Sequence, residues 1–243
     1  MAKLQHLARA PIIEALIDIR VTLPKQARQI DYLAGLDEQF RGQYPDKKTT
    51  QEVRYQFELA HPEAEERTTT PLGFRYTNAD NTQVIQATIN GFTFSRLTPY
   101  QDWSKLREEA LKTWNIYSDH VQPESITRVA ARYINKLTFP GPLIDFDHYL
   151  RYCPVVPKAL PQVLGGFFSR IVVPDEKLEC TAIITQMFQP SPTEITVVLD
   201  IDAFREKVFA DMREAWEVLD HLRDFKNLIF FDSITEKTVK LYK

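Results

Sequence analysis

The amino-acid sequence predicts an α+β fold, in which an antiparallel sheet carries helices packed on one face. Several segments alternate apolar and polar residues with a period of two, which is typical of strands with one buried face. Two longer segments repeat their apolar residues at helical spacing. Consecutive strands joined by short turns form antiparallel sheets, and amphipathic helices cover one apolar face of such a sheet.

The first half of the chain begins with the clearest strand, Ile12–Leu23, which Pro24 ends. A helix is expected over Ile30–Phe40, because its apolar residues recur at helical spacing. Four more strands are expected over 53–59, 73–77, 84–89 and 92–97, with an acidic loop at 61–66. Asn90-Gly91 is the strongest hairpin signal. Asp102 can cap a long helix that turns inward Trp103, Leu106, Ala110, Leu111 and Trp114.

The second half repeats this order. A long strand covers Ile126–Phe139, and a short helix covers Phe146–Arg151. Three further strands are expected over 167–173, 178–188 and 195–201. The last long helix is expected to bury Val208, Met212, Trp216, Leu219 and Leu222, and a capping box at 233–236 predicts a short terminal helix.

Landmarks in the two halves lie at nearly constant offsets. Pro24 matches Pro140, Ile30-Asp31 matches Ile144-Asp145, and Trp103 matches Trp216, each pair 113 to 116 residues apart. Such spacing predicts a pseudo-duplication of a β-α-β-β-β-α unit. We therefore expect two halves, residues 1–123 and 124–243, packed closely as one compact unit because residues 118–125 make only a short connection.

Composition excludes several classes of protein. The 243 residues include 30 Lys and Arg against 33 Asp and Glu, and only seven glycines. Seven glycines leave little room for loops that bring backbone close to phosphate, and none of the familiar glycine-rich motifs occurs. Histidines and cysteines show no metal-binding spacing, so the sequence predicts no metal site, no cofactor and no catalytic residue. Without a signal peptide or an apolar run that spans a bilayer, a cytoplasmic bacterial protein is expected, with no membrane partner.

The long strand of the second half carries a basic row, formed by Arg128, Arg132 and Lys136. Residues four apart in a strand share a face, so the row could follow a nucleic-acid backbone. Alternatively, its cations pair with Glu14, Asp18 or Glu58 on neighbouring strands. The nearly balanced net charge of −3 favours the second interpretation.

The opening strand places Glu14, Asp18 and Arg20 on one polar face. Glu14 and Arg20 are interpreted first as cross-strand ion-pair partners and second as part of a binding site. The carboxylates of Glu14 and Asp18 are too far apart, about 13 Å along a strand, to cooperate as a catalytic acid and base.

The stretch Pro11–Arg20, with its Glu14-Ala15 and Ile19-Arg20 pairs, resembles the opening of a sporadically distributed family of uncharacterised bacterial proteins of similar length. The central Arg132-Tyr133-Ile134-Asn135 and the C-terminal stretch 227–235 are similar to two further signatures of that family. The resemblance supplies no activity. It implies that the fold or the function needs Glu14, Arg20, Arg132, Tyr133 and Asn135.

Three functions are considered. The first is a non-enzymatic interaction, regulatory or accessory protein that binds a protein partner, such as the product of a neighbouring gene, or forms a homo-oligomer. The second is a nucleic-acid-binding protein that uses the basic row. The third is a small-ligand binder or enzyme with a sheet–helix cavity lined by Trp103, Trp114 and Trp216. The candidate binding residues are Glu14, Arg20, Arg128, Arg132, Asn135 and Lys136.

Overall fold

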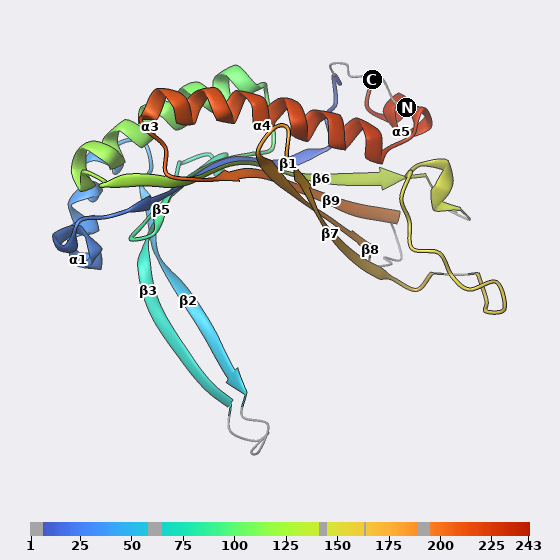
Figure 1. Ribbon diagram of the computed structural model, residues 1–243, viewed down its shortest axis with the longest axis horizontal. Helices are drawn as coiled ribbons and strands as arrows, with labels where there is room; N and C mark the ends of the chain where they lie inside the picture. Colours follow the sequence, from blue (N-terminus) through green and yellow to red (C-terminus); the bar gives the residue numbers. More distant parts are fainter. Residues whose placement is uncertain (1–6, 58–64, 141–144, 163, 189–194) are drawn as a thin grey trace.

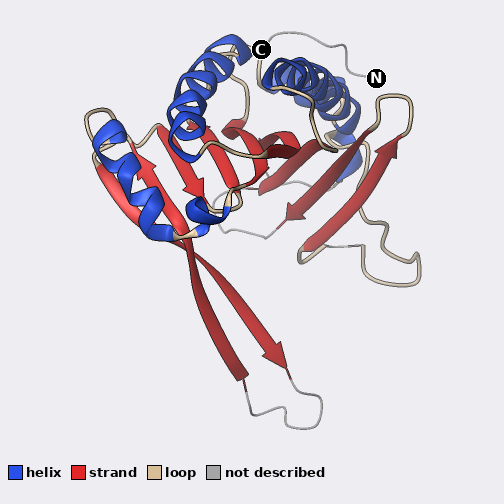
Figure 2. Ribbon diagram, turned by 60° about the vertical axis from the view of Figure 1, so that its left-hand side comes forward, coloured by secondary structure: helices blue, strands red, loops and turns tan. Residues whose placement is uncertain are grey.

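A computed structural model describes residues 7–57, 65–140, 145–162, 164–188 and 195–243. The α+β prediction is confirmed. These residues form an antiparallel sheet of nine strands in the order β2-β3-β4-β5-β1-β6-β9-β8-β7. The long helices α3 and α4 lie on one face of it (Figure 2). The opposite face, named here the open face, is concave because both ends of the sheet bend away from the helices (Figure 1).

The elements follow the predicted order in both halves. The first half contains β1 (Ile12–Thr22), η1 (Lys25–Arg28), α1 (Ile30–Leu33), η2 (Ala34–Leu36), α2 (Asp37–Phe40), β2 (Asp46–Phe57), β3 (Glu65–Thr77), β4 (Gln83–Thr88), β5 (Gly91–Leu97) and α3 (Trp103–Val121). The second contains β6 (Ser125–Phe139), η3 (Phe146–His148), β7 (Phe167–Asp175), β8 (Cys180–Phe188), β9 (Ile195–Glu206), α4 (Met212–Ser233) and α5 (Glu236–Leu241).

The two halves share one sheet. Antiparallel pairing of β1 with β6 forms the seam between them. Moving outward from the seam, the strands run β1, β5, β4, β3, β2 on one side and β6, β9, β8, β7 on the other. Each half thus starts at the seam and places its last strand beside its first. Internal duplication stays a prediction.

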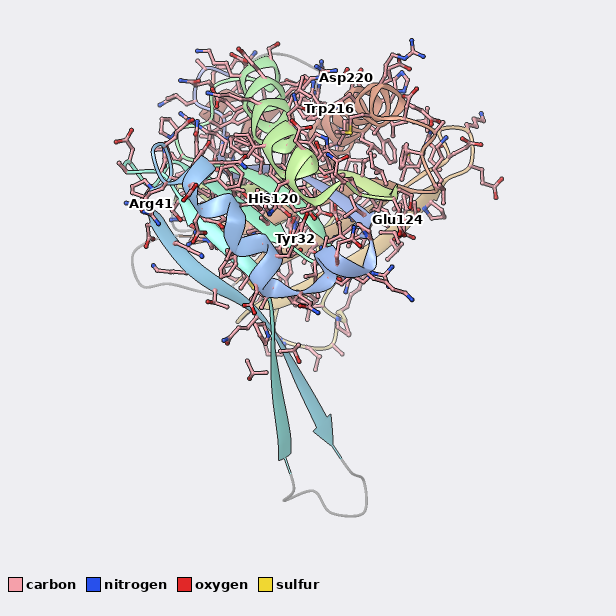
Figure 3. All side chains as sticks on the ribbon, turned by 90° about the vertical axis from the view of Figure 1, so that its left-hand side faces the viewer. Tyr32, Arg41, His120, Glu124, Trp216 and Asp220 are labelled. Atoms are coloured by element: carbon pink, nitrogen blue, oxygen red, sulfur yellow. The ribbon has the colours of Figure 1, made fainter. Side chains whose placement is uncertain are left out.

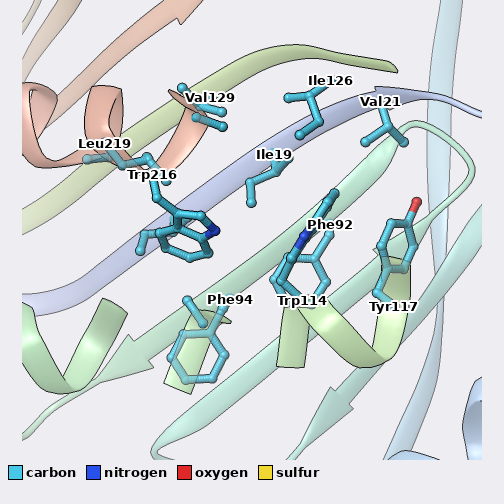
Figure 4. Packing of buried hydrophobic residues seen from close by; sticks show 14 of the residues in the cluster. Ile19, Val21, Phe92, Phe94, Trp114, Tyr117, Ile126, Val129, Trp216 and Leu219 are labelled. Atoms are coloured by element: carbon cyan, nitrogen blue, oxygen red, sulfur yellow. The ribbon is translucent and has the colours of Figure 1, made fainter. Parts of the chain in front are cut away.

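The core lies between the sheet and the helices (Figure 4). Alternation on β1 turns Ile17 and Ile19 toward the helices, where both are fully buried. From α3, Trp114 packs edge-on against Phe92 of β5, with ring centres 5.8 Å apart. Trp216 of α4 belongs to the same cluster (Figure 4). Apolar alternation in the strands therefore decides which face the helices cover.

Side-chain caps set where the long helices begin. Asp102 accepts a hydrogen bond from the backbone N–H of Lys105 at 2.9 Å, as its position before the helix predicts. Asp211 caps α4 in the same way, through the N–H of Glu214 at 2.8 Å. Because α4 begins only after Asp211, the prediction that Val208 is buried by this helix was wrong, and Val208 is 72% exposed.

The helix predicted over residues 30–40 is broken into short turns that pack against the end of α3. Gly35 lies against the His120 ring, where an added Cβ would stand 2.5 Å from Cε1. The Tyr32 hydroxyl donates to the His120 carbonyl at 3.1 Å, and the two rings are 4.9 Å apart (Figure 3). Close contact with α3 thus shapes this segment more than its own helical periodicity does.

Two strands are longer than predicted. β2 and β3 pair along their whole length and form a hairpin that projects away from the helices (Figure 1). Glu65 and Glu66, expected in a loop, belong to β3, whereas Glu63 lies outside the described residues. The residues added to β2, 46–52, are all polar, so they carry no alternation from which a strand could be predicted.

The short helix predicted over 146–151 is a single 3-10 turn, because Leu150 instead forms a β-bridge with Ile234. Within the described part of the chain, no helix has both the length and the apolar character needed to cross a membrane.

Candidate functional site

Five of the six candidate residues lie on the open face near the seam. On β1 the buried Ile17 and Ile19 face the helices, so Glu14, Asp18 and Arg20 face the other way. On β6 the same argument places Arg128, Arg132 and Lys136 on the open face, opposite Val129 and Tyr133. Asn135 is the exception, because it points to the helix side and is 2% exposed.

Asp18 is the centre of a group of charges at the seam. Its carboxylate accepts hydrogen bonds from Arg20 Nε at 3.0 Å, Arg128 Nη1 at 2.8 Å and Thr93 Oγ1 at 2.8 Å. Arg20 therefore pairs with Asp18 of its own strand, whereas the sequence predicted that Glu14 and Arg20 would each pair with a residue of a neighbouring strand. Residues two apart in a strand share a face, which brings Asp18 within reach of Arg20.

Arg128 bridges three strands. It donates to Asp18 of β1 and, through Nη2, to Asp202 of β9 at 2.8 Å. Its guanidinium carbon also lies 4.4 Å from the centre of the Phe204 ring. Burial raises the pKa of Asp202, and Arg128 and Arg132 oppose that rise. Packing and pairing thus hold Arg128 in place on the sheet.

Arg132 is held by a two-point contact with β9. Its Nε and Nη2 donate to the two carboxylate oxygens of Asp200 at 2.8 and 2.5 Å. Hydrogen bonding to Asp200 raises the pKa of Arg132. Planar, bidentate pairs of this kind are among the stronger ion pairs in proteins.

Acidic residues therefore neutralise most of the basic row. Pairing of Arg128 with Asp18 agrees with the second of the two sequence interpretations, while Glu58 lies outside the described residues. Asp200 and Asp202 were not among the predicted partners: the predicted strand 195–201 includes Asp200 but ends before Asp202, whereas β9 continues to Glu206 and places both on one face beside the row. Lys136 lies exposed at the end of the row.

The helix side holds a second group of polar residues, around a cavity of about 400 Å³ named here the helix-side cavity. Asn135 lies at this cavity, and its Nδ2 donates to the carbonyls of Tyr133 and Leu199 at 3.3 and 3.0 Å. The cavity is lined by residues 7, 8 and 10–12, by the segment that leads into α3, and by parts of β6 and α4. Its lining includes Tyr100, Trp103, Tyr133, Arg223, Lys226 and Phe230.

Lys226 is the most unusual residue of the helix-side cavity. It is only 6% exposed, and its Nζ lies 3.4 Å from the centre of the Tyr133 ring. No hydrogen bond or ion pair to its Nζ occurs among the described residues. Burial, aided by the nearby Arg223, lowers the pKa of Lys226 to about 7. The sequence signal was its place in the inward stripe Leu219, Leu222, Lys226, Phe230.

Two tyrosines complete this group. The hydroxyls of Tyr100 and Tyr133 are 3.1 Å apart, and their rings meet edge to face. Burial raises the pKa of Tyr100 to about 12 and raises the pKa of Tyr133 well above its ordinary value. Both hydroxyls are therefore protonated at neutral pH.

The three tryptophans do not line one cavity. Trp103 borders the helix-side cavity, and its Nε1 donates to Asp220 of α4 at 2.7 Å. Trp216, one turn before Asp220 (Figure 3), belongs to the core, as does Trp114. The cavity predicted from the tryptophans thus includes Trp103 alone.

One edge of the sheet, named here the β7 edge, leaves apolar side chains uncovered. Phe168 and Val172 are 66% and 59% exposed, and Ile171 and Val173 on the other face are also exposed. The opposite edge of the sheet is formed by β2, which begins with the charged residues Asp46, Lys47 and Lys48. Charged residues on edge strands are a common protection against unwanted strand pairing.

A second cavity, of about 530 Å³, lies where β7 begins. Phe146 lines it and packs edge-on against Phe167, the first residue of β7. Most of its other lining residues are apolar and include Val155, Val156, Leu164, Phe188 and Ile195. Apolar surface thus continues from the β7 edge toward this cavity.

Neither cysteine is activated. Cys153 and Cys180 are free, and burial raises the pKa of the Cys153 thiol to about 11. In the described ranges, no three His, Cys, Asp or Glu side chains gather in a way that could hold a metal ion.

Comparison of the whole chain with known protein families, curated proteins and solved structures finds no match in any of the three.

Proposed function

We propose that this chain is a non-enzymatic accessory protein, and that it binds another protein by adding an extended segment of that partner to the β7 edge. The observation that carries the proposal is the exposure of apolar side chains on both faces of β7. An edge strand also offers unpaired backbone N–H and C=O groups, so it can template a further strand.

Charge and shape specify the partner segment. On the open face of β7, Arg170 lies between Phe168 and Val172. None of the ion pairs in the described residues includes Arg170. A partner strand with an acidic residue opposite Arg170, flanked on the same face by apolar residues, would complement this edge. Beyond Phe167, the partner could insert an apolar side chain into the cavity lined by Phe146 and Phe188.

A second copy of this chain fits the β7 edge less well. Antiparallel pairing of β7 with its own copy would bring the turn Asp175-Glu176-Lys177 of one chain toward Phe167 and the apolar cavity of the other. Asp145 and Asp147 also line that cavity, so they would repel Asp175 and Glu176 of the copy, and only Lys177 would gain a partner of opposite charge. We therefore favour a different protein over the homo-oligomer.

Nucleic-acid binding has less support. Two of the three cations of the basic row, Arg128 and Arg132, are already engaged by aspartates: Asp18 and Asp202 pair with Arg128, and Asp200 pairs with Arg132. Phosphate contacts gain free energy by releasing counterions from unpaired Lys and Arg, and neutralised cations contribute little to that term.

Selection from a library of random nine-residue peptides tests the proposal. We expect the immobilised protein to enrich peptides with alternating apolar residues and a central acid. Val172→Lys places a charge on the β7 edge and should abolish the enrichment. Leu228→Lys is the matched control, since Leu228 is a similarly exposed aliphatic residue on α4.

Enrichment that persists in Val172→Lys would contradict the proposal. So would dimerisation of the unmodified chain that Val172→Lys abolishes, because the β7 edge would then be covered by a second copy. DNA or RNA binding at low salt that is lost on reversing Arg128, Arg132 and Lys136 would instead favour the second hypothesis.

A further inference from the structure

Lys226 in the helix-side cavity is a buried amine without a counter-ion among the described residues. A buried ammonium group usually pairs with a carboxylate, because leaving it unpaired costs several kcal/mol. Here the Nζ contacts only the face of the Tyr133 ring among the groups the structure describes. No carboxylate or other hydrogen-bond acceptor within the described residues pairs with this amine.

The charged and titratable groups around Lys226 come from three directions. Arg223 lies one turn earlier on α4, and Tyr133 lies beneath on β6. Tyr100 and Asp102 come from the segment that leads into α3. Asp102, the one carboxylate that lines the cavity, is engaged in capping α3.

Arg223 adds a second unused donor. Its Nη1 pairs with Asp224 at 2.7 Å, but its Nε is buried and has no hydrogen-bond partner. Both residues line the helix-side cavity, which therefore holds two cationic donors and, within the described residues, no carboxylate other than the capping Asp102. This pair of donors calls for an anionic group supplied from outside the described chain.

The rest of the cavity is suited to an apolar group. Its lining includes Pro11, Ile12, Trp103, Phe230 and Phe231. Its volume of about 400 Å³ falls within the range typical of small-molecule sites. The negative charge of Asp102 at the same cavity disfavours a ligand with a second anionic group.

We propose that the helix-side cavity binds a small monocarboxylate with an apolar body, whose carboxylate pairs with Lys226 and accepts a hydrogen bond from Arg223. The site lies on the helix side of the sheet, so it is separate from the β7 edge and does not depend on the proposed function.

Titration calorimetry tests this proposal with four probes, namely butanoate, hexanoate, phenylacetate and indole-3-acetate. Because the carboxylate binds the protonated amine, binding should take up close to one proton per ligand at about pH 8.5. The dissociation constant should rise about tenfold per pH unit from just above pH 7 until the pKa of the complex is reached. Buffers of different ionisation enthalpy measure the proton uptake directly.

Two comparisons separate charge recognition from apolar binding. Phenylacetamide has the shape of phenylacetate without its charge, so it should bind roughly 100-fold more weakly to the unaltered protein. Lys226→Met should lose the preference for phenylacetate and the proton uptake. Lys112→Met is the control, because Lys112 is an exposed lysine of α3 outside the lining of the cavity.

Binding of phenylacetate and phenylacetamide with equal affinity, or binding without proton uptake, would overturn the proposal. Failure of all four carboxylates to bind the unaltered protein at millimolar concentration would overturn it too. These results are obtained without Lys226→Met, so they hold even if that variant does not fold.

Discussion

Arg128 of β6 donates a hydrogen bond to Asp18 of β1 at 2.8 Å, so an ion pair crosses the seam between the two halves of the chain. The same guanidinium group reaches Asp202 on β9 at 2.8 Å. Arg128, selected from the sequence as a candidate binding residue, therefore ties three adjacent strands together at the middle of the sheet.

Replacing Asp18 with Asn should destabilise the protein by about 2 kcal/mol, because it removes the charge that Arg20 and Arg128 share while leaving both cations in place. Urea unfolding measures this change. Asp46→Asn is the control, since Asp46 pairs with Lys48 at 3.4 Å on an exposed strand and should cost less than about 0.5 kcal/mol. Equal effects of the two substitutions would show that Asp18 has no special role in the seam.

Gly91→Ala should destabilise the protein by at least about 3 kcal/mol. Gly91 has a φ of +151°, and an added Cβ would stand 2.2 Å from the carbonyl oxygen of Ile19 on β1. Gly42→Ala is the matched control, because nothing lies within 4 Å of the added carbon, and we expect a change below about 0.5 kcal/mol. Thermal unfolding of both variants checks this, and a Gly91→Ala protein of unchanged stability would contradict the close pairing of β5 with β1.

The pH dependence of stability should reveal Lys226. Its pKa is about 7 in the folded protein against an ordinary 10.5, so the unfolded chain binds more protons between these values. Stability should therefore rise with pH over this range. The opposite holds above about pH 10, since burial raises the pKa of Tyr100 to about 12 and the unfolded chain loses that proton first.

Lys226→Met removes the part of the pH dependence of stability that comes from Lys226 and leaves the part that comes from Tyr100. Its free energy of unfolding should exceed that of the unaltered protein near pH 6, and the difference should shrink as the pH approaches 10. Denaturant titrations at several pH values measure both curves. A constant difference across this range would mean that Lys226 keeps an ordinary pKa in the fold.

Much of the fold could be predicted from the sequence, because strands with one buried face carry their own signal. Alternation predicted the two strands of the seam over Ile12–Leu23 and Ile126–Phe139, each within one residue of the observed bounds. The hairpin of β2 and β3 has a weaker sequence signal, because residues 46–52 are polar and show no alternation of apolar and polar side chains. Strand formation there follows from pairing with β3, which is a property of the folded chain.

The candidate sites were predicted only in part, for a different reason. The sequence correctly placed the side chains of Arg128 and Arg132 on one face of the sheet. Their partners Asp200 and Asp202 come from a strand far along the chain. Lys226 was missed because a lysine in an amphipathic helix is ordinarily exposed. The stripe Leu219, Leu222, Lys226, Phe230 places it on the inward face of the helix, but the cavity that receives its side chain is formed by segments far apart in the sequence.

The central claim is that the β7 edge accepts a strand with an acid opposite Arg170, and reversing that charge tests it most directly. Fluorescence anisotropy would measure the affinity of a selected peptide, and of the same peptide with its central acid replaced by Lys, for the unaltered protein and for Arg170→Glu. Arg170→Glu should lower the affinity for the acidic peptide and raise the affinity for the lysine peptide, each by roughly tenfold. Unchanged affinities for both peptides would contradict the claim.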